Sequence, residues 1–118
     1  MNYRYQTKKI VHKGYARKSS EAEDKQVLSI ESQITDNIKI AQQQNIKINE
    51  GDILHEEKSA KNPFGRPIFE KLIESIEDGE VQGIITWHAN RLSRNPIDAA
   101  RIIDLFDRGK LVEIITQQ

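Results

Sequence analysis

The sequence contains no cysteine and is poor in aromatic residues, which make up 6% of the chain. Without cysteine it can form neither a disulfide framework nor a thiolate metal site, so it is compatible with a reducing interior and we expect a cytoplasmic location. No apolar run approaches the roughly 20 residues that a membrane-spanning helix needs, and the polar start Met1 to Lys9 lacks the apolar centre of a secretion signal. We therefore expect no membrane partner.

The sequence also has no excess of charge of either sign, because 18 Lys and Arg residues balance 18 Asp and Glu residues. This balance argues against a nucleic-acid partner, since phosphate groups usually select a basic surface. The local field depends on arrangement, however, and not only on the sum. Arg91 and Arg94 stand together in an expected loop while many acidic residues fall on expected helix faces, so a local basic site remains open.

A chain of 118 residues, 36% of them apolar, can bury one hydrophobic core but not two. We therefore predict one domain over residues 1–118, with residues 1–8 as a flexible tail. The sequence stops directly after its last expected strand, and we expect it to be a piece of a longer protein.

Apolar residues recur with the periods of strands and helices along the chain. Short apolar runs predict four strands, which are Ile10–Arg17, Ile48–Glu56, Val81–Trp87 and Leu111–Thr116. Stripes at helical spacing predict three helices between them, namely Ser29–Gln44, Pro67 to about Gly79, and Pro96 to about Gly109. Polar loops follow the first three strands, at Lys18–Val27, Lys58–Arg66 and His88–Asn95.

This βαβαβαβ order predicts an α/β fold with a mostly parallel sheet of about four strands and helices on both faces, in a Rossmann-like three-layer arrangement. In such sheets ligands bind beyond the carboxyl ends of the strands. All three polar loops lie at that edge, and we therefore expect the functional site there.

A serine and an arginine stand together where the first strand ends. A serine hydroxyl attacks a phosphodiester only if one group accepts its proton and others stabilise the charge on the phosphate oxygens. Arg17 lies two residues before Ser19, so in extended geometry both side chains point to the same side. Taken alone, a serine after a strand is more often a turn residue or a helix N-cap.

Three further arginines follow the other strands. Arg91 and Arg94, three residues apart, project from one side if their segment turns helically, and planar guanidinium groups match phosphate oxygens two at a time. Arg66 stands just before the second helix, where it adds positive charge beside the amino end of that helix. Taken alone, each of these arginines is more often an ordinary surface residue.

Other polar residues carry less information about chemistry. The three histidines lack the spacing of a metal site, and Tyr15 and Trp87 are interpreted as packing residues. The carboxylates Glu56–Glu57 and Asp78–Glu80 are dispersed, so a solvated surface explains them better than a metal site does. The sequence has no nucleotide-binding glycine motif, and we therefore expect neither a metal nor a cofactor.

Together, the segments from Ile10 to Thr116 resemble the serine recombinases, the family of resolvases, invertases and large phage-type integrases. Tyr15-Ala16-Arg17-Lys18-Ser19 resembles the Y-x-R-x-S signature of that family, whose serine is the nucleophile. Ser29-Ile30-Glu31-Ser32-Gln33 resembles its S-I-x-x-Q, in which Gln33 matches an active-site glutamine. Arg66-Pro67 resembles the R-P that carries a further active-site arginine, and the segment Trp87 to Arg94 resembles the loop K-L-D-R-L-S-R, whose two arginines fall on Arg91 and Arg94.

The sequence departs from the family pattern at Asn90, where the family usually has an aspartate. An amide cannot carry the charge with which a carboxylate orients an arginine or handles a proton. The departure implies either reduced activity or a minor role for this position, and asparagine would partly preserve a role that depends on geometry alone.

The resemblance implies a site-specific DNA recombinase in which Ser19 forms a 5′-phosphoserine link, without metal or ATP. The implied site comprises Ser19, Gln33 and the phosphate-binding arginines Arg17, Arg66, Arg91 and Arg94. The resemblance further implies a bacterial or phage origin, a homodimer that pairs into a tetramer in the full-length protein, and a separate region that selects the DNA site. Two alternatives remain, a catalytically idle assembly module of this fold and a doubly wound domain that binds another phosphorylated ligand.

Overall fold

A computed structural model describes residues 9–19 and 28–117 of the chain. The strands are β1 (His12–Lys18), β2 (Ile53–Glu57), β3 (Gly83–Thr86) and β4 (Glu113–Thr116). The helices are α1 (Ile30–Gln43), α2 (Pro67–Glu77) and α3 (Pro96–Asp107), and two short 3-10 turns are η2 (Glu50–Asp52) and η3 (Ala89–Arg91). The predicted βαβαβαβ order is confirmed.

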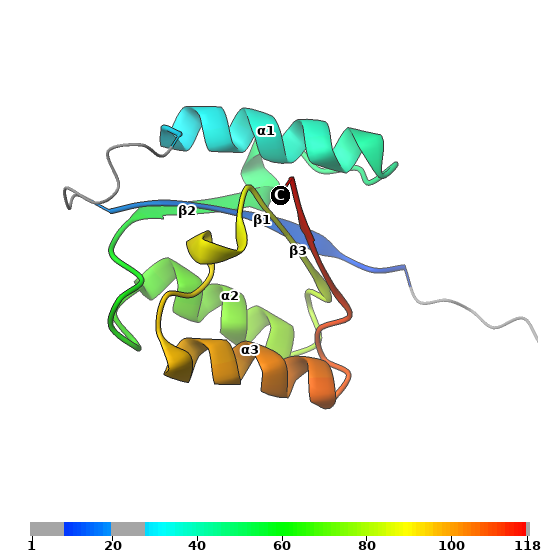
Figure 1. Cartoon of the computed structure of the whole chain (residues 1–118). Coiled ribbons are helices and arrows are strands. Elements are labelled where there is room, and N and C mark those ends of the chain that lie inside the picture. Colours follow the sequence, from blue (N-terminus) through cyan, green and yellow to red (C-terminus); the bar gives the residue numbers. More distant parts are fainter. Residues whose placement is uncertain (1–8, 20–27, 118) are drawn as a thin grey trace, which may run out of the picture.

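The four strands form one parallel sheet in the order β2-β1-β3-β4. Helix α1 covers one face of the sheet, and α2 and α3 cover the other (Figure 1). The α/β fold with helices on both faces is therefore as predicted. Because all strands are parallel, their carboxyl ends lie along a single edge, where Ser19 follows β1 and the loops after β2 and β3 begin.

Local sequence signals explain where the helices begin and end. The Ser29 hydroxyl accepts a hydrogen bond from the backbone N–H of Ser32 at 3.1 Å, which caps α1. Pro67 and Pro96 occupy the first positions of α2 and α3, where a missing N–H has no cost. Gly79 and Gly109 follow the ends of these helices with φ of 81° and 71°, a conformation that favours glycine.

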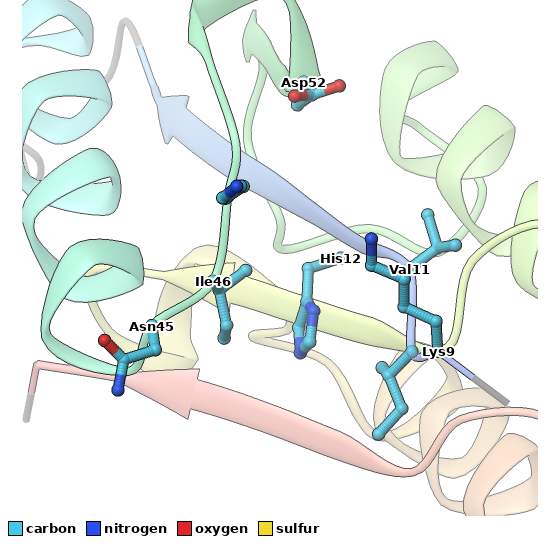
Figure 2. A pocket seen from close by; sticks show the side chains of 8 residues that line it. Lys9, Val11, His12, Asn45, Ile46 and Asp52 are labelled. Atoms are coloured by element: carbon cyan, nitrogen blue, oxygen red, sulfur yellow. The ribbon is translucent and has the colours of Figure 1, made fainter. Parts of the chain in front are cut away.

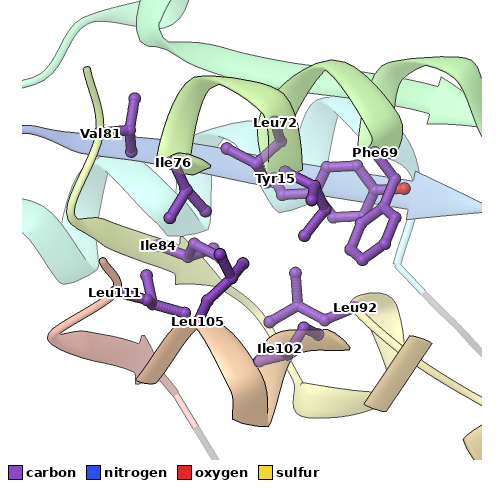
Figure 3. Packing of buried hydrophobic residues seen from close by; sticks show 11 residues of the cluster. Tyr15, Phe69, Leu72, Ile76, Val81, Ile84, Leu92, Ile102, Leu105 and Leu111 are labelled. Atoms are coloured by element: carbon purple, nitrogen blue, oxygen red, sulfur yellow. The ribbon is translucent and has the colours of Figure 1, made fainter. Parts of the chain in front are cut away.

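The main hydrophobic core lies between the sheet and the helices α2 and α3 (Figure 3). It brings together Tyr15 of β1, Phe69 and Leu72 of α2, and Leu105 of α3. A smaller cluster formed by Ile40, Ala41 and Ile85 packs α1 on the opposite face. The sheet is thus held by packing on both of its faces.

The strands are shorter than the sequence predicts. β2 begins at Ile53 and not at Ile48, because the residues before it turn into η2, where the Asn49 N–H donates to the Asp52 side chain at 2.9 Å. β1 begins at His12, the first residue in register with β3, while Ile10 and Val11 are 40% and 44% exposed. The predicted tail over residues 1–8 and most of the predicted loop from Lys18 to Val27 lie outside the described residues.

Candidate active site

Three arginines from distant segments meet at the carboxyl edge of the sheet. Arg17 comes from the end of β1, Arg66 from the residue before α2, and Arg91 from η3, and each is at most 1% exposed. The backbone carbonyl of Arg91 accepts hydrogen bonds from Arg17 Nε at 2.9 Å and from Arg66 Nη1 at 3.0 Å. Arg91 Nη1 in turn donates to the backbone carbonyl of Arg17 at 2.8 Å. We call Arg17, Arg66 and Arg91 the arginine cluster.

Carbonyl oxygens of the surrounding loops accept further hydrogen bonds from this cluster. Arg17 donates to the carbonyls of Lys58 and Asn90 at 3.0 and 2.9 Å, and Arg66 Nη2 donates to that of Leu92 at 2.5 Å. Carbonyl dipoles thereby offset part of the cost of burying cationic groups. The cluster is enclosed by protein, so Arg66 and Arg91 are not the ordinary surface residues that such arginines, taken alone, more often are.

Ser19 directly follows β1 at the same edge of the sheet and is 3% exposed. It stands two residues after Arg17, at the junction where the strand conformation ends. Residues 20–27, which follow it, lie outside the described part of the chain. The predicted nucleophile is thus buried at the carboxyl end of the strand that also supplies an arginine of the cluster.

Gln33 attaches helix α1 to the backbone of β1. Its Oε1 accepts the Arg17 N–H at 3.1 Å, and its Nε2 donates to the carbonyls of Arg17 and Leu28 at 3.0 and 2.9 Å. The side chain is fully buried. Gln33 therefore fixes the backbone close to Ser19. The partners of its side chain in these contacts are all main-chain atoms.

Arg94 does not join the arginine cluster. The helical turn η3 ends at Arg91, and Ser93 Oγ donates to the Asn95 carbonyl at 2.8 Å in the turn that leads to α3. Arg94 therefore does not continue the turn that places Arg91, and it is exposed. It borders an apolar groove of about 710 Å³ that Ile103 and Phe106 of α3 also line.

Asn90 orients one arginine of the cluster. Its Oδ1 accepts a hydrogen bond from Arg91 Nε at 3.0 Å. The guanidinium carbon of Arg91 also lies 6.0 Å from the centroid of the Trp87 ring. An asparagine thus supplies the acceptor that positions Arg91, although it lacks the charge of a carboxylate.

A buried carboxylate, Glu56, was missed by the sequence analysis. The prediction of a solvated surface for Glu56–Glu57 is wrong for Glu56, which is 8% exposed. Glu56 accepts hydrogen bonds from the Tyr15 hydroxyl at 2.5 Å and from the N–H groups of Ile68 and Phe69 at 3.1 and 2.9 Å. Backbone N–H groups at the amino end of α2 thus bind the Glu56 carboxylate, and the helix dipole favours a negative charge at this place. The sequence signal that could have indicated its burial was its position at the end of a strand that is followed by a helix.

The second buried carboxylate that the sequence analysis missed, Asp98, pairs with the arginine cluster. Its Oδ2 lies 3.2 Å from Arg66 Nη2, and its Oδ1 accepts a hydrogen bond from Arg101 Nη1 at 3.0 Å. Burial by itself raises the pKa of Asp98, but hydrogen bonds from Asn95, Arg101 and Arg66 outweigh that effect and hold the pKa below its usual range. Asp98 therefore stays ionised beside Arg66.

Another hollow lies at the opposite edge of the sheet. It has a volume of about 660 Å³ and is lined by residues that include Lys9, His12, Asn45 and Asp52 (Figure 2).

Within residues 9–19 and 28–117, no group of three or more His, Cys, Asp or Glu side chains has the arrangement of a metal site. No helix among these described residues has both the length and the apolar character to cross a membrane.

The resolvase N-terminal domain family matches residues 13–118 of the chain. Similar solved structures include the N-terminal catalytic domain of TP901-1 integrase, with 26% identity, a TM-score of 0.72, and coverage of 91% of this chain and 77% of that chain. The C-terminal catalytic domain of ISC1926 TnpA, an IS607-like serine recombinase, has 24% identity and a TM-score of 0.71, with coverage of 92% and 70%.

A third similar structure is the first open reading frame of transposon ISC1904 from Sulfolobus solfataricus, with 20% identity and a TM-score of 0.63, covering 92% of this chain and 67% of that chain. The two structures below 25% identity show the shared fold. A search of the curated proteins found no match.

Proposed function

Since the chain belongs to the resolvase family of serine recombinases, as a catalytic domain of that family, we propose that Ser19 is its nucleophile for cutting and rejoining DNA. The observation that carries the proposal is the convergence of Arg17, Arg66 and Arg91 at the end of the strand that presents Ser19. Guanidinium groups held in fixed positions stabilise the charge that develops on a phosphate during substitution.

The proposed reaction is a pair of transesterifications. Ser19 Oγ attacks a backbone phosphorus and loses its proton, the bond from phosphorus to the 3′ oxygen breaks, and that oxygen leaves as a protonated 3′-hydroxyl. The phosphate remains joined to the 5′ oxygen and is now esterified to Ser19. The 3′-hydroxyl of an exchanged strand then attacks this phosphoserine and restores a phosphodiester. Because each step replaces one phosphate ester by another, no ATP is required. No metal is required in this proposal, because the arginines stabilise the charge that a metal ion handles in many nucleases.

The residues of the site have distinct proposed roles. Arg17, Arg66 and Arg91 bind the reacting phosphate and stabilise its charge, while Gln33 holds the backbone that carries Arg17 and Ser19. Arg94 is exposed and is proposed to bind a DNA phosphate beside the cluster. The proposed partner is thus DNA, and assembly into a homodimer and tetramer is proposed for the full-length protein, which we place in the cytoplasm.

One observation favours the alternative of a catalytically idle assembly module. Ser19 is 3% exposed and the arginine cluster is enclosed by carbonyl groups. If this arrangement persists on DNA, the phosphate does not reach the serine. The two functions are therefore separated by whether a covalent link to DNA forms.

The experiment captures that link from a mixture of DNA sequences, so the recombination site does not have to be identified first. The full-length protein is incubated with fragmented genomic DNA of the organism that encodes it, denatured in detergent, and separated with any DNA attached to it, which is then sequenced. We expect recurrent fragments attached through a 5′ phosphate, and none with Ser19→Ala. Equal capture by Ser19→Ala would contradict the role of Ser19, and absence of capture by the unmodified protein would support the idle module.

A further inference from the structure

In the described part of the chain, a buried carboxylate to which the serine recombinase signature assigns no role lies against the arginine cluster. Asp98 belongs to the first turn of α3, and both its side chain and that of Arg66 are 1% exposed. Arg66 reaches the site from the loop before α2, so the pair joins two segments that lie 32 residues apart. A buried cation needs a partner of opposite charge in a fixed place, and here that partner is Asp98.

The position of the Asp98 carboxylate is itself determined by Asn95. The Asn95 amide donates to Asp98 Oδ2 at 2.8 Å and to the backbone carbonyl of Ala60 at 3.0 Å, while Asn95 Oδ1 accepts the Asp98 N–H at 2.8 Å. One side chain thus caps α3, fixes the carboxylate and attaches the loop that precedes Arg66. Asn95 is 8% exposed, so this geometry is shielded from water.

The contacts of Arg66 leave one donor uncommitted. Nη1 and Nη2 are hydrogen-bonded, and the guanidinium carbon lies 3.8 Å from the centroid of the Phe69 ring. Among the described residues, Arg66 Nε is buried without a hydrogen-bond partner. The Nε–H of Arg66 therefore remains available to another acceptor. The direction in which it points depends on the groups that hold Nη1 and Nη2.

From these contacts we infer that Asp98, oriented by Asn95, is a positioning residue that holds Arg66 in the geometry required for strand cleavage. This inference rests on the proposed function of the arginine cluster. Asp98 does not touch the phosphate, and it acts by fixing where the Arg66 charge lies. Cleavage should therefore depend on the charge at position 98 and on the amide at position 95.

The test uses the DNA fragment captured by the unmodified full-length protein and measures the single-turnover rate of covalent attachment. We expect Asp98→Asn, which keeps the shape and removes the charge, to slow attachment at least tenfold. Asp104→Asn is the matched control, because Asp104 also lies on α3 and pairs with an arginine, Arg108, at an exposed position. The control should attach at the normal rate.

A second variant covers the case in which Asp98→Asn does not fold. Asn95→Ala keeps both charges but removes the amide that orients the carboxylate, and we expect a several-fold slower attachment. Asn49→Ala is its control, since it is the same substitution in another capping residue but lies before η2, away from Asp98. Equal rates for Asn95→Ala and Asn49→Ala would overturn the inference, as would an unchanged rate for folded Asp98→Asn.

Chemical rescue separates positioning from a purely structural role. Free guanidinium, added far below denaturing concentrations, should restore part of the attachment lost in Arg66→Ala, because Asp98 still offers a binding place for the cation. The same addition should not rescue Arg66→Ala combined with Asn95→Ala, and equal rescue of both would overturn the inference. If the unmodified protein forms no link to DNA, the proposed function fails. If the unmodified protein and Asp98→Asn form the link at the same rate, only the role of Asp98 fails.

Discussion

Gln33 and the backbone of Arg17 form a closed hydrogen-bonded pair, in which the amide oxygen accepts the Arg17 N–H at 3.1 Å and the amide nitrogen donates to the Arg17 carbonyl at 3.0 Å. A side chain of α1 thereby acts like an additional strand segment beside the end of β1. It bonds both the backbone N–H and the backbone carbonyl of Arg17, which lies two residues before Ser19. Loss of this pair should affect both stability and catalysis.

Gln33→Ala should lower the free energy of unfolding by about 1–3 kcal/mol, because it leaves buried backbone groups of Arg17 without this partner. It should also slow covalent attachment to DNA, since the end of β1 then moves more freely. Urea denaturation measures the first effect. Gln42→Ala, at an exposed position of the same helix, should change stability by no more than about 0.5 kcal/mol.

Asn90→Asp should maintain or raise the rate of strand cleavage. The asparagine already supplies the acceptor for Arg91 Nε at 3.0 Å, and a carboxylate in that place would form a charge-assisted hydrogen bond of greater strength. The rate of attachment to the captured DNA fragment is the measurement, with Asn90→Ala as the comparison that removes the acceptor. A large loss in Asn90→Asp would show that the site requires a neutral group at this position.

Gly83→Ala should destabilise the fold by about 1–3 kcal/mol through overpacking. The His12 side chain crosses Gly83 to reach Glu113 on β4, where Nε2 lies 2.5 Å from Oε2, and a Cβ at position 83 would come closer to the imidazole than real Cβ atoms do. In a His12→Ala background the same change should be neutral or stabilising, because the obstruction is gone. A double-mutant cycle by thermal unfolding measures this coupling, and additive effects would contradict it.

Tyr15→Phe should make stability less sensitive to alkaline pH. Burial raises the pKa of Tyr15 well above its usual range, so the folded state keeps the phenol neutral while the unfolded state ionises near pH 10. The contribution of the neutral Tyr15 phenol to the free energy of unfolding is therefore complete below pH 10 and declines as pH rises above that value. Urea titrations between about pH 9 and 11 should show a steeper loss for the unmodified protein. Parallel curves for both proteins would contradict the prediction.

The order of elements follows from the sequence because side-chain periodicity is a local property of the backbone. Residues Phe69, Leu72, Ile73 and Ile76 repeat at helical spacing and lie buried along α2. Strand ends were less predictable, as Ile48 shows, because they depend on where the neighbouring strand offers partners. The arginines of the cluster were predicted from their places at or after the ends of successive strands, since parallel strands bring these positions to one edge.

The sequence by itself thus determined the parallel α/β topology, the edge proposed to carry the site and the membership in the resolvase family, because each depends on local periods and short motifs. Tertiary structure decided which polar groups are buried. Arg91 is enclosed while Arg94, three residues later, is exposed. Glu56 and Asp98 are buried although their sequence neighbours Glu57 and Ile97 are exposed. The reason is that burial and pairing depend on groups far apart in the chain, such as the 32 residues between Arg66 and Asp98, which no local pattern encodes.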